Sequence, residues 1–205
     1  MIILVRHGQT TTNARNLLVG ISNPDLTELG RAQAASLAPL LSGVKEVWTS
    51  PLKRAKDTAQ IAVPHLEAKV NDAFIEVDYG TYDGTPITEV EPTVWASFMR
   101  NHDEALGGGE SLASVDERVH GALESLLADP ESLLHSTSEH LAIFSHVSPI
   151  KSTVAWALGV PGSVAWRTRL DNGSITSVIA RNATPSLLRF NMLPEEHFVA
   201  KTFKD

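Results

Sequence analysis

Short apolar runs alternate along this chain with longer segments whose apolar residues recur every three or four positions. The runs are typical of buried strands and lie at residues 1–5, 44–48, 141–145, 174–180 and 186–190. The longer segments predict helices with one buried face and lie at residues 27–41 and 111–127. Two more helices are expected. One starts at Ser50-Pro51, with the Ser50 hydroxyl as its cap, and the other lies after Pro149. This alternation favours an α/β fold.

The middle of the chain has a less regular pattern. Residues 85–101 mix Val90, Trp95 and Phe98 with charged side chains, which predicts a helix with irregular ends. Gly107 to Gly109 then interrupt the chain before the next helix. A length of 205 residues without a repeat or a linker suits a single domain over residues 1–205. We expect residues 85–110 to form a lid or a substrate-selecting segment of that domain.

Polar groups follow two of the predicted strands. The first strand ends at Arg6-His7-Gly8, and the run at residues 141–145 ends at His146. In open α/β sheets, ligands bind outside the carboxyl ends of the strands. We therefore expect both imidazoles to meet at one edge of the sheet.

Each histidine also has a simpler interpretation, as a hydrogen-bonded residue at a strand end. A metal site is a second interpretation, but two histidines without a third ligand at a typical spacing make a weak zinc motif. Arg6, and Arg54 in the helix after Ser50-Pro51, would repel a dication. A guanidinium group instead suits phosphate oxygens, which it can bind two at a time.

The composition excludes several classes of partner and of site chemistry. A net charge of −7 and a pI near 5.6 argue against a nucleic-acid partner, although a few cations gathered in one cleft could still bind a small phosphate ester. The chain has no cysteine, which excludes disulfides, thiolate nucleophiles and cysteine-ligated zinc. No signal-like amino terminus and no apolar stretch of membrane-spanning length is present, so we expect a cytoplasmic protein with no membrane partner.

These residues carry a resemblance to a known family. The chain resembles the histidine phosphatase superfamily, also called the phosphoglycerate mutase-like family, in a series of blocks that follow the family's order and cover most of the chain. The blocks are Arg6-His7-Gly8-Gln9-Thr10, Leu26-Thr27-Glu28-Leu29-Gly30-Arg31, Ser50-Pro51-Leu52-Lys53-Arg54, Glu76-Val77-Asp78-Tyr79-Gly80, Gly108-Gly109-Glu110-Ser111 and Ser145-His146. Together they are far more specific than an Arg-His-Gly triplet alone.

The resemblance implies a three-layer α/β/α fold with a mostly parallel central sheet, and a metal-independent enzyme without a cofactor. His7 would be the nucleophile that forms a phosphohistidine. Glu76 would protonate the leaving oxygen and then activate water. This role requires burial or acidic neighbours, and Asp78 and Asp83 lie close to Glu76 in the sequence. The substrate phosphate would be held by the side chains of Arg6, Asn13, Arg54 and His146 and by the backbone N–H of Val147.

Some features distinguish members of the family. Val147-Ser148 stands where many relatives have two glycines, and the continuation after Tyr79-Gly80 lacks a mutase-like signature. We therefore expect a phosphomonoester hydrolase of the phosphatase branch. A cofactor-dependent phosphoglycerate mutase is the alternative, and a non-catalytic phosphate-binding module ranks below it because the proposed nucleophile and acid are both present. The partner would be a small phosphorylated metabolite, which the sequence does not identify. The sequence is also compatible with a homodimer.

Overall fold

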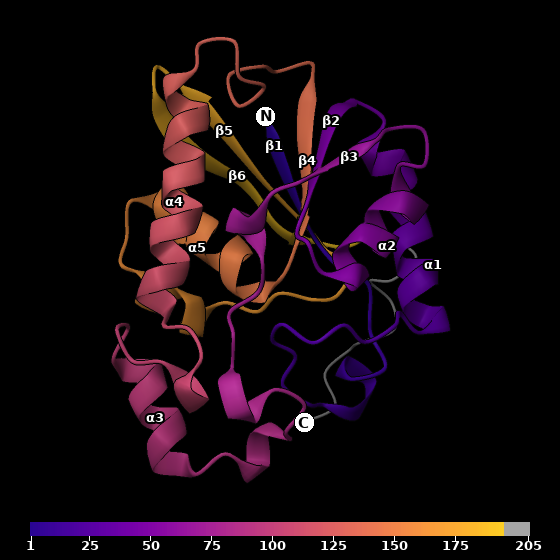
Figure 1. Ribbon diagram of the computed structural model, residues 1–205. Helices are drawn as coiled ribbons and strands as arrows, with labels where there is room; N and C mark the ends of the chain where they lie inside the picture. The colour runs from indigo at the N-terminus through magenta and orange to yellow at the C-terminus, as the bar shows by residue number, and fades with distance from the viewer. Residues whose placement is uncertain (195–205) are drawn as a thin grey trace.

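The computed structural model describes residues 1–194, in which six strands form one mixed sheet (Figure 1). The sheet order is β3-β2-β4-β1-β5-β6. β1 is parallel to β4, and β2 is parallel to β3 and β4, whereas β5 is antiparallel to β1 and β6 to β5. The strands are β1 (Ile2–Arg6), β2 (Val44–Thr49), β3 (Ala68–Val70), β4 (His140–Ser145), β5 (Ile175–Arg181) and β6 (Thr184–Met192).

Helices cover both faces of this sheet (Figure 1). α1 (Glu28–Ser36) and α2 (Lys53–Ala62) pack together on one face. α4 (Leu112–Ala128) and α5 (Val147–Leu158) pack together on the other, and α3 (Pro92–Arg100) lies beyond the lower end of α4 in the view. The predicted three-layer α/β/α fold with a mostly parallel sheet is therefore confirmed.

The alternation of side chains along β1 explains why the strand is apolar throughout. Ile2 and Leu4 belong to the core under α4 and α5, and Ile3 and Val5 belong to the core under α1 and α2. Each of the four is at most 4% exposed. A strand covered on both faces has no side that favours polar residues, so it reads as a continuous apolar run.

Three elements differ from the prediction. The helix expected over residues 27–41 ends at Ser36 and continues as a 3₁₀ helix over Ala38–Leu41, with a proline at its start that cannot donate a backbone hydrogen bond. The edge strand β3 was not predicted, because its three residues give no pattern to detect. The helix expected over residues 85–101 is the shorter α3, preceded by a 3₁₀ turn at Ile87–Glu89.

Both helices expected next to the site begin elsewhere than predicted. α2 begins at Lys53 without a side-chain cap, so Ser50 is not its N-cap. α5 begins at Val147, directly after His146, and Pro149 lies inside its first turn, where a missing N–H costs little.

Two glycines bring α1 against the end of β1. A Cβ on Gly8 would lie 2.2 Å from the Gly30 carbonyl oxygen, and a Cβ on Gly30 would lie 2.0 Å from that of Gln9. Only glycine fits such an approach.

No helix within residues 1–194 has both the length and the apolar character needed to cross a membrane.

Candidate active site

The two predicted histidines lie side by side at the carboxyl ends of β1 and β4. The parallel register pairs Arg6 with Ser145, so His7 and His146 each come one residue after a matched pair. Their ring centroids are 5.1 Å apart. Arg54, near the start of α2, hydrogen-bonds to both rings. The structure thus brings together three side chains that are distant in the sequence.

The hydrogen bonds of His7 define its tautomer. Nδ1 lies 2.7 Å from the Gly8 carbonyl oxygen, which can only accept, so Nδ1 carries the proton. Nε2 accepts a hydrogen bond of 3.1 Å from Arg54 Nε. The His7 carbonyl in turn accepts from Asn172 Nδ2 at 3.2 Å and from the Gly173 N–H at 3.1 Å. The ring therefore presents the Nε2 lone pair from a fixed position.

Arg54 is fully buried at 0% exposure. Its Nε is shared between His7 Nε2 and His146 Nδ1, the latter at 3.2 Å, and its terminal nitrogens donate to the carbonyls of Ser22 at 2.7 Å and Gly20 at 2.8 Å. Burial lowers the pKa of Arg54 to about 10, which leaves the guanidinium charged at neutral pH.

Asp83 supports Arg54 rather than the predicted acid. It was proposed as an acidic neighbour of Glu76, but its carboxylate accepts from the backbone N–H groups of Gly20 at 3.0 Å and Ser22 at 2.9 Å. The carbonyls of these two residues receive Arg54. Asp83 therefore fixes the loop that holds the guanidinium.

His146 carries its proton on the opposite nitrogen from His7. Because Nδ1 accepts from Arg54, Nε2 donates to Ser50 Oγ at 2.7 Å. Burial, and then the positive charge of Arg54, lower the pKa of both imidazoles well below their usual value. Both rings are therefore neutral at neutral pH, as a nitrogen nucleophile must be.

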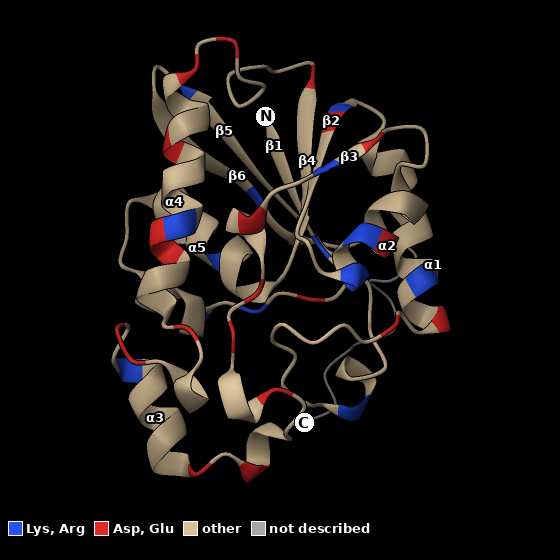
Figure 2. Ribbon diagram, viewed as in Figure 1, with Lys and Arg blue, Asp and Glu red and all other residues tan. Residues whose placement is uncertain are grey.

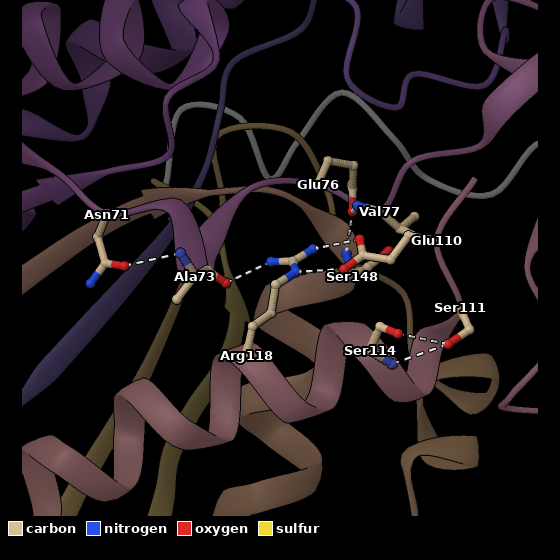
Figure 3. A network of polar contacts seen from close by, with 9 residues as sticks. All are labelled: Asn71, Ala73, Glu76, Val77, Glu110, Ser111, Ser114, Arg118 and Ser148. Atoms are coloured by element: carbon tan, nitrogen blue, oxygen red, sulfur yellow. Dashed lines mark hydrogen bonds and ion pairs between the residues drawn. The ribbon is translucent and has the colours of Figure 1, made fainter.

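Glu76 binds the amino terminus of α5. Its carboxylate is 4% exposed and accepts from the backbone N–H groups of Val147 at 3.0 Å, Ser148 at 3.1 Å and its own neighbour Val77 at 2.9 Å, and Figure 3 shows the side chain beside Val77 and Ser148. The positive end of a helix dipole stabilises a carboxylate in such a place. The Val147 N–H, expected to bind substrate phosphate, is occupied by Glu76 in this structure.

The two remaining predicted phosphate ligands, Arg6 and Asn13, differ in the hydrogen-bond donors that they have for a ligand. Arg6 donates to the Leu170 carbonyl, and its buried Nε has no partner among residues 1–194. Burial lowers the pKa of Arg6, and the negative charge of Glu76 opposes that effect. Asn13 uses its side-chain oxygen to accept from Thr10 N at 3.1 Å and Thr10 Oγ1 at 2.9 Å. Its nitrogen is the end that could donate to a ligand.

Sequence reasoning missed the residues that orient the imidazoles. Ser50 was interpreted as a helix cap and instead accepts from His146. Asn172, just before β5, holds the His7 backbone and had no pattern to mark it. Tyr79 belonged to a recognised motif without a role, and its hydroxyl hydrogen-bonds with Ser148. Its pKa is raised, first by burial and then by the negative charge of Glu76.

Comparison with known proteins agrees with this geometry. The chain matches the histidine phosphatase superfamily (branch 1) over residues 2–193 and belongs to it. The match confirms the resemblance that the sequence motifs indicated.

Individual relatives have phosphatase and mutase names. Phosphoserine phosphatase 1 of Hydrogenobacter thermophilus is 34% identical over 93% of this chain and 92% of its own length. A probable phosphoglycerate mutase of Yersinia pestis is 31% identical over 86% of this chain and 83% of its own length. A phosphoserine phosphatase mutant of Entamoeba histolytica, solved in complex with phosphoserine, has a TM-score of 0.82 and is 26% identical over 93% of this chain and 95% of that chain. The chain is thus a histidine phosphatase superfamily enzyme.

Proposed function

We propose that this protein hydrolyses phosphomonoesters through a phosphohistidine on His7. The observation that carries the proposal is the environment of His7 Nε2, whose lone pair lies beside a buried guanidinium while Nδ1 is tied to a carbonyl. A neutral, oriented nitrogen next to a cation is suited to attack a phosphate whose negative oxygens that cation attracts.

In the first step the Nε2 lone pair forms a bond to phosphorus and the bond from phosphorus to the ester oxygen breaks. Arg6 and Arg54 bind the non-bridging oxygens, together with the free amide end of Asn13. His146 joins them once its Nε2–H leaves Ser50, and the Val147 N–H joins them once Glu76 moves. The protonated carboxyl of Glu76 gives its proton to the leaving alcohol oxygen.

In the second step the Glu76 carboxylate takes a proton from water as the water oxygen attacks phosphorus. The bond from phosphorus to Nε2 breaks, inorganic phosphate leaves, and Glu76 is protonated again for the next cycle. Each proton and electron pair is accounted for by the ester, water and these two side chains.

The test measures phosphate release from 4-nitrophenyl phosphate and traps the intermediate by rapid quenching. The wild type should yield an alkali-stable, acid-labile phosphoryl group on His7. His7→Ala should lose about 10³-fold or more in kcat, the scale of removing a nucleophile. His65→Ala, which changes an exposed histidine, is the matched control.

The same assay separates the alternatives. Interconversion of 3- and 2-phosphoglycerate that depends on bisphosphoglycerate and outpaces phosphate release would establish a mutase, as the name of the Yersinia pestis relative suggests. A wild type that binds phosphate without turnover of any ester would establish a binding module. Similarity to phosphoserine phosphatases makes phosphoserine the first physiological candidate to assay.

A further inference from the structure

A pocket of about 460 Å³, measured with its open mouth, adjoins the proposed acid. Its lining includes the aromatic residues Tyr79, Phe98 and Trp166, and also Val147 and Ser148. The backbone N–H groups of these last two residues bind Glu76. The pocket therefore adjoins the place where the leaving oxygen would receive its proton, which is where the alcohol part of a substrate must lie.

Lys151 places a cation in the wall of this pocket. It follows Ser148 by three residues and Val147 by four, so it lies about one helical turn, roughly 5 Å, along the same face of α5. Its Nζ donates to the carbonyls of Ala165 and Thr168, both at 2.7 Å. An ammonium group has three N–H donors, so one remains for a ligand.

The charge of Lys151 has no counterion among residues 1–194, where no carboxylate lies within ion-pair distance of Nζ. Burial and the charge of Arg6 lower its pKa. Asp116, the acid of the same pocket, is already hydrogen-bonded to His102 Nε2 at 2.7 Å. The pocket thus has a cation without a carboxylate partner and a carboxylate that already has a hydrogen-bond partner.

Two further polar groups belong to the pocket residues Ser152 and Trp166. Ser152 Oγ and Trp166 Nε1 are buried and make no hydrogen bond within the described chain. Both groups can donate, so together with Lys151 they add hydrogen-bond donors to the residues that line the pocket. Such a site favours a ligand group that accepts hydrogen bonds and carries negative charge.

We propose that this pocket binds the alcohol part of the substrate and that Lys151 binds a carboxylate on it, so that phosphate esters of small hydroxy acids are the preferred class. The inference rests on the proposed function. The spacing of one helical turn between Ser148 and Lys151 suits an acid of about three carbons. An ion pair in a partly dry aromatic pocket is stronger than one in water. Phe98 and His102 lie within residues 85–110, so under this proposal that segment takes part in selecting the substrate.

The experiment compares kcat/KM for phosphate release from 3-phosphoglycerate and glycerol 3-phosphate, which differ by a carboxylate in place of a hydroxymethyl group. The wild type should prefer the carboxylate by about 10-fold or more, the scale of one charge-assisted hydrogen bond. Lys151→Gln retains donors for the two carbonyls but removes the charge, and should bring the ratio close to one. Lys151→Arg, which retains the charge, should keep most of the preference.

The ratio of kcat/KM for the two esters distinguishes a substrate-binding role of Lys151 from a purely structural one. If Lys151 only holds the 3₁₀ helix Gly162–Arg167 in place, its variants should lower kcat/KM for both esters alike and leave the ratio unchanged, which would overturn the inference. Should Lys151→Gln fail to fold, as judged by thermal unfolding, Lys151→Met gives the same comparison, and the wild-type ratio alone still decides whether the carboxylate is preferred. A wild type that hydrolyses both esters equally defeats this inference only. A wild type that hydrolyses neither these nor an aryl phosphate defeats the proposed function.

Discussion

His7 and His146 share one donor, Arg54 Nε, but carry their protons on opposite nitrogens. We predict that ¹⁵N NMR will find His7 protonated on Nδ1 and His146 on Nε2, with both rings neutral at pH 6. The reason is that burial and the Arg54 charge disfavour an imidazolium. Loss of one set of signals in His7→Gln assigns the resonances. The same tautomer in both rings, or titration of either near pH 6.5, would contradict the hydrogen-bonding pattern.

Arg54 gives a second prediction at the scale of one side chain. Lysine can keep the charge, but it cannot reach both imidazoles and the carbonyls of Gly20 and Ser22 with one ammonium group. Arg54→Lys should therefore lower kcat/KM for an aryl phosphate by about 10² to 10³-fold, the scale of losing one oriented donor in an active site. Lys56→Met removes an exposed charge from the same helix and should have little effect. If both variants retained similar activity, the geometry of Arg54 would be irrelevant to the reaction.

Residue types at the site could be predicted from the sequence, but their partners could not. The strand-end positions of His7 and His146 follow from local patterns. The contact of Glu76 with Val147 spans 71 positions and depends on α5 beginning at Val147, whereas the proline pattern placed the start after Pro149. An error of three residues at a helix end is enough to hide the contact.

At the scale of elements, the segment that carries Glu76 is held by the sheet and by α4. Ser145 Oγ, at the end of β4, donates to the Phe74 carbonyl at 2.7 Å. Arg118 of α4 donates to the Ala73 carbonyl at 2.6 Å and forms a two-pronged ion pair with Glu110, at 2.8 and 2.9 Å (Figure 3). The Glu110 N–H then donates to the Asp78 carbonyl at 2.8 Å. The chain is thus fixed on both sides of Glu76.

We predict that Arg118 is a positioning residue for Glu76. Arg118→Met should lower kcat by about 10 to 10²-fold with a smaller change in KM, because a displaced acid slows the chemical step while the proposed phosphate ligands stay in place. Arg118→Lys should recover part of the loss. Glu117→Gln, an exposed change in the same helix, controls for charge.

The pH profile distinguishes this role from a purely structural one. A misplaced Glu76 should alter the limb of kcat that depends on the general acid, whereas general destabilisation would lower the melting temperature and leave the profile of the folded enzyme unchanged. Arg118→Met with a wild-type kcat and only a lower melting temperature would refute the positioning role.

At the scale of the whole molecule, the acidic residues and the buried cationic group of Arg54 lie in different places. Acidic residues occur along the helices and loops that surround the sheet, and basic residues occur among them (Figure 2). Arg54, by contrast, is fully buried against the two imidazoles. The composition, with a net charge of −7, predicts a local rather than an extended anion site but does not show how deep the cation lies. Depth depends on the loop at Gly20 and Ser22 folding over α2, which no local pattern in the sequence reveals.

The buried imidazoles also predict how the stability of the whole protein depends on pH. In the unfolded chain His7 and His146 bind protons as the pH falls through about 6.5, whereas in the folded protein their lowered pKa values keep them neutral. Since the unfolded state then binds more protons, their contribution to stability is complete above about pH 6.5 and is lost progressively as the pH falls below it. Melting temperatures measured between pH 8 and pH 5 should therefore fall on the acid side, by about 2–4 °C for each kcal/mol lost. His146→Gln, whose amide can accept from Arg54 and donate to Ser50 without titrating, should show a shallower fall than the wild type. Parallel curves for the two proteins would mean that His146 does not contribute to the acid sensitivity.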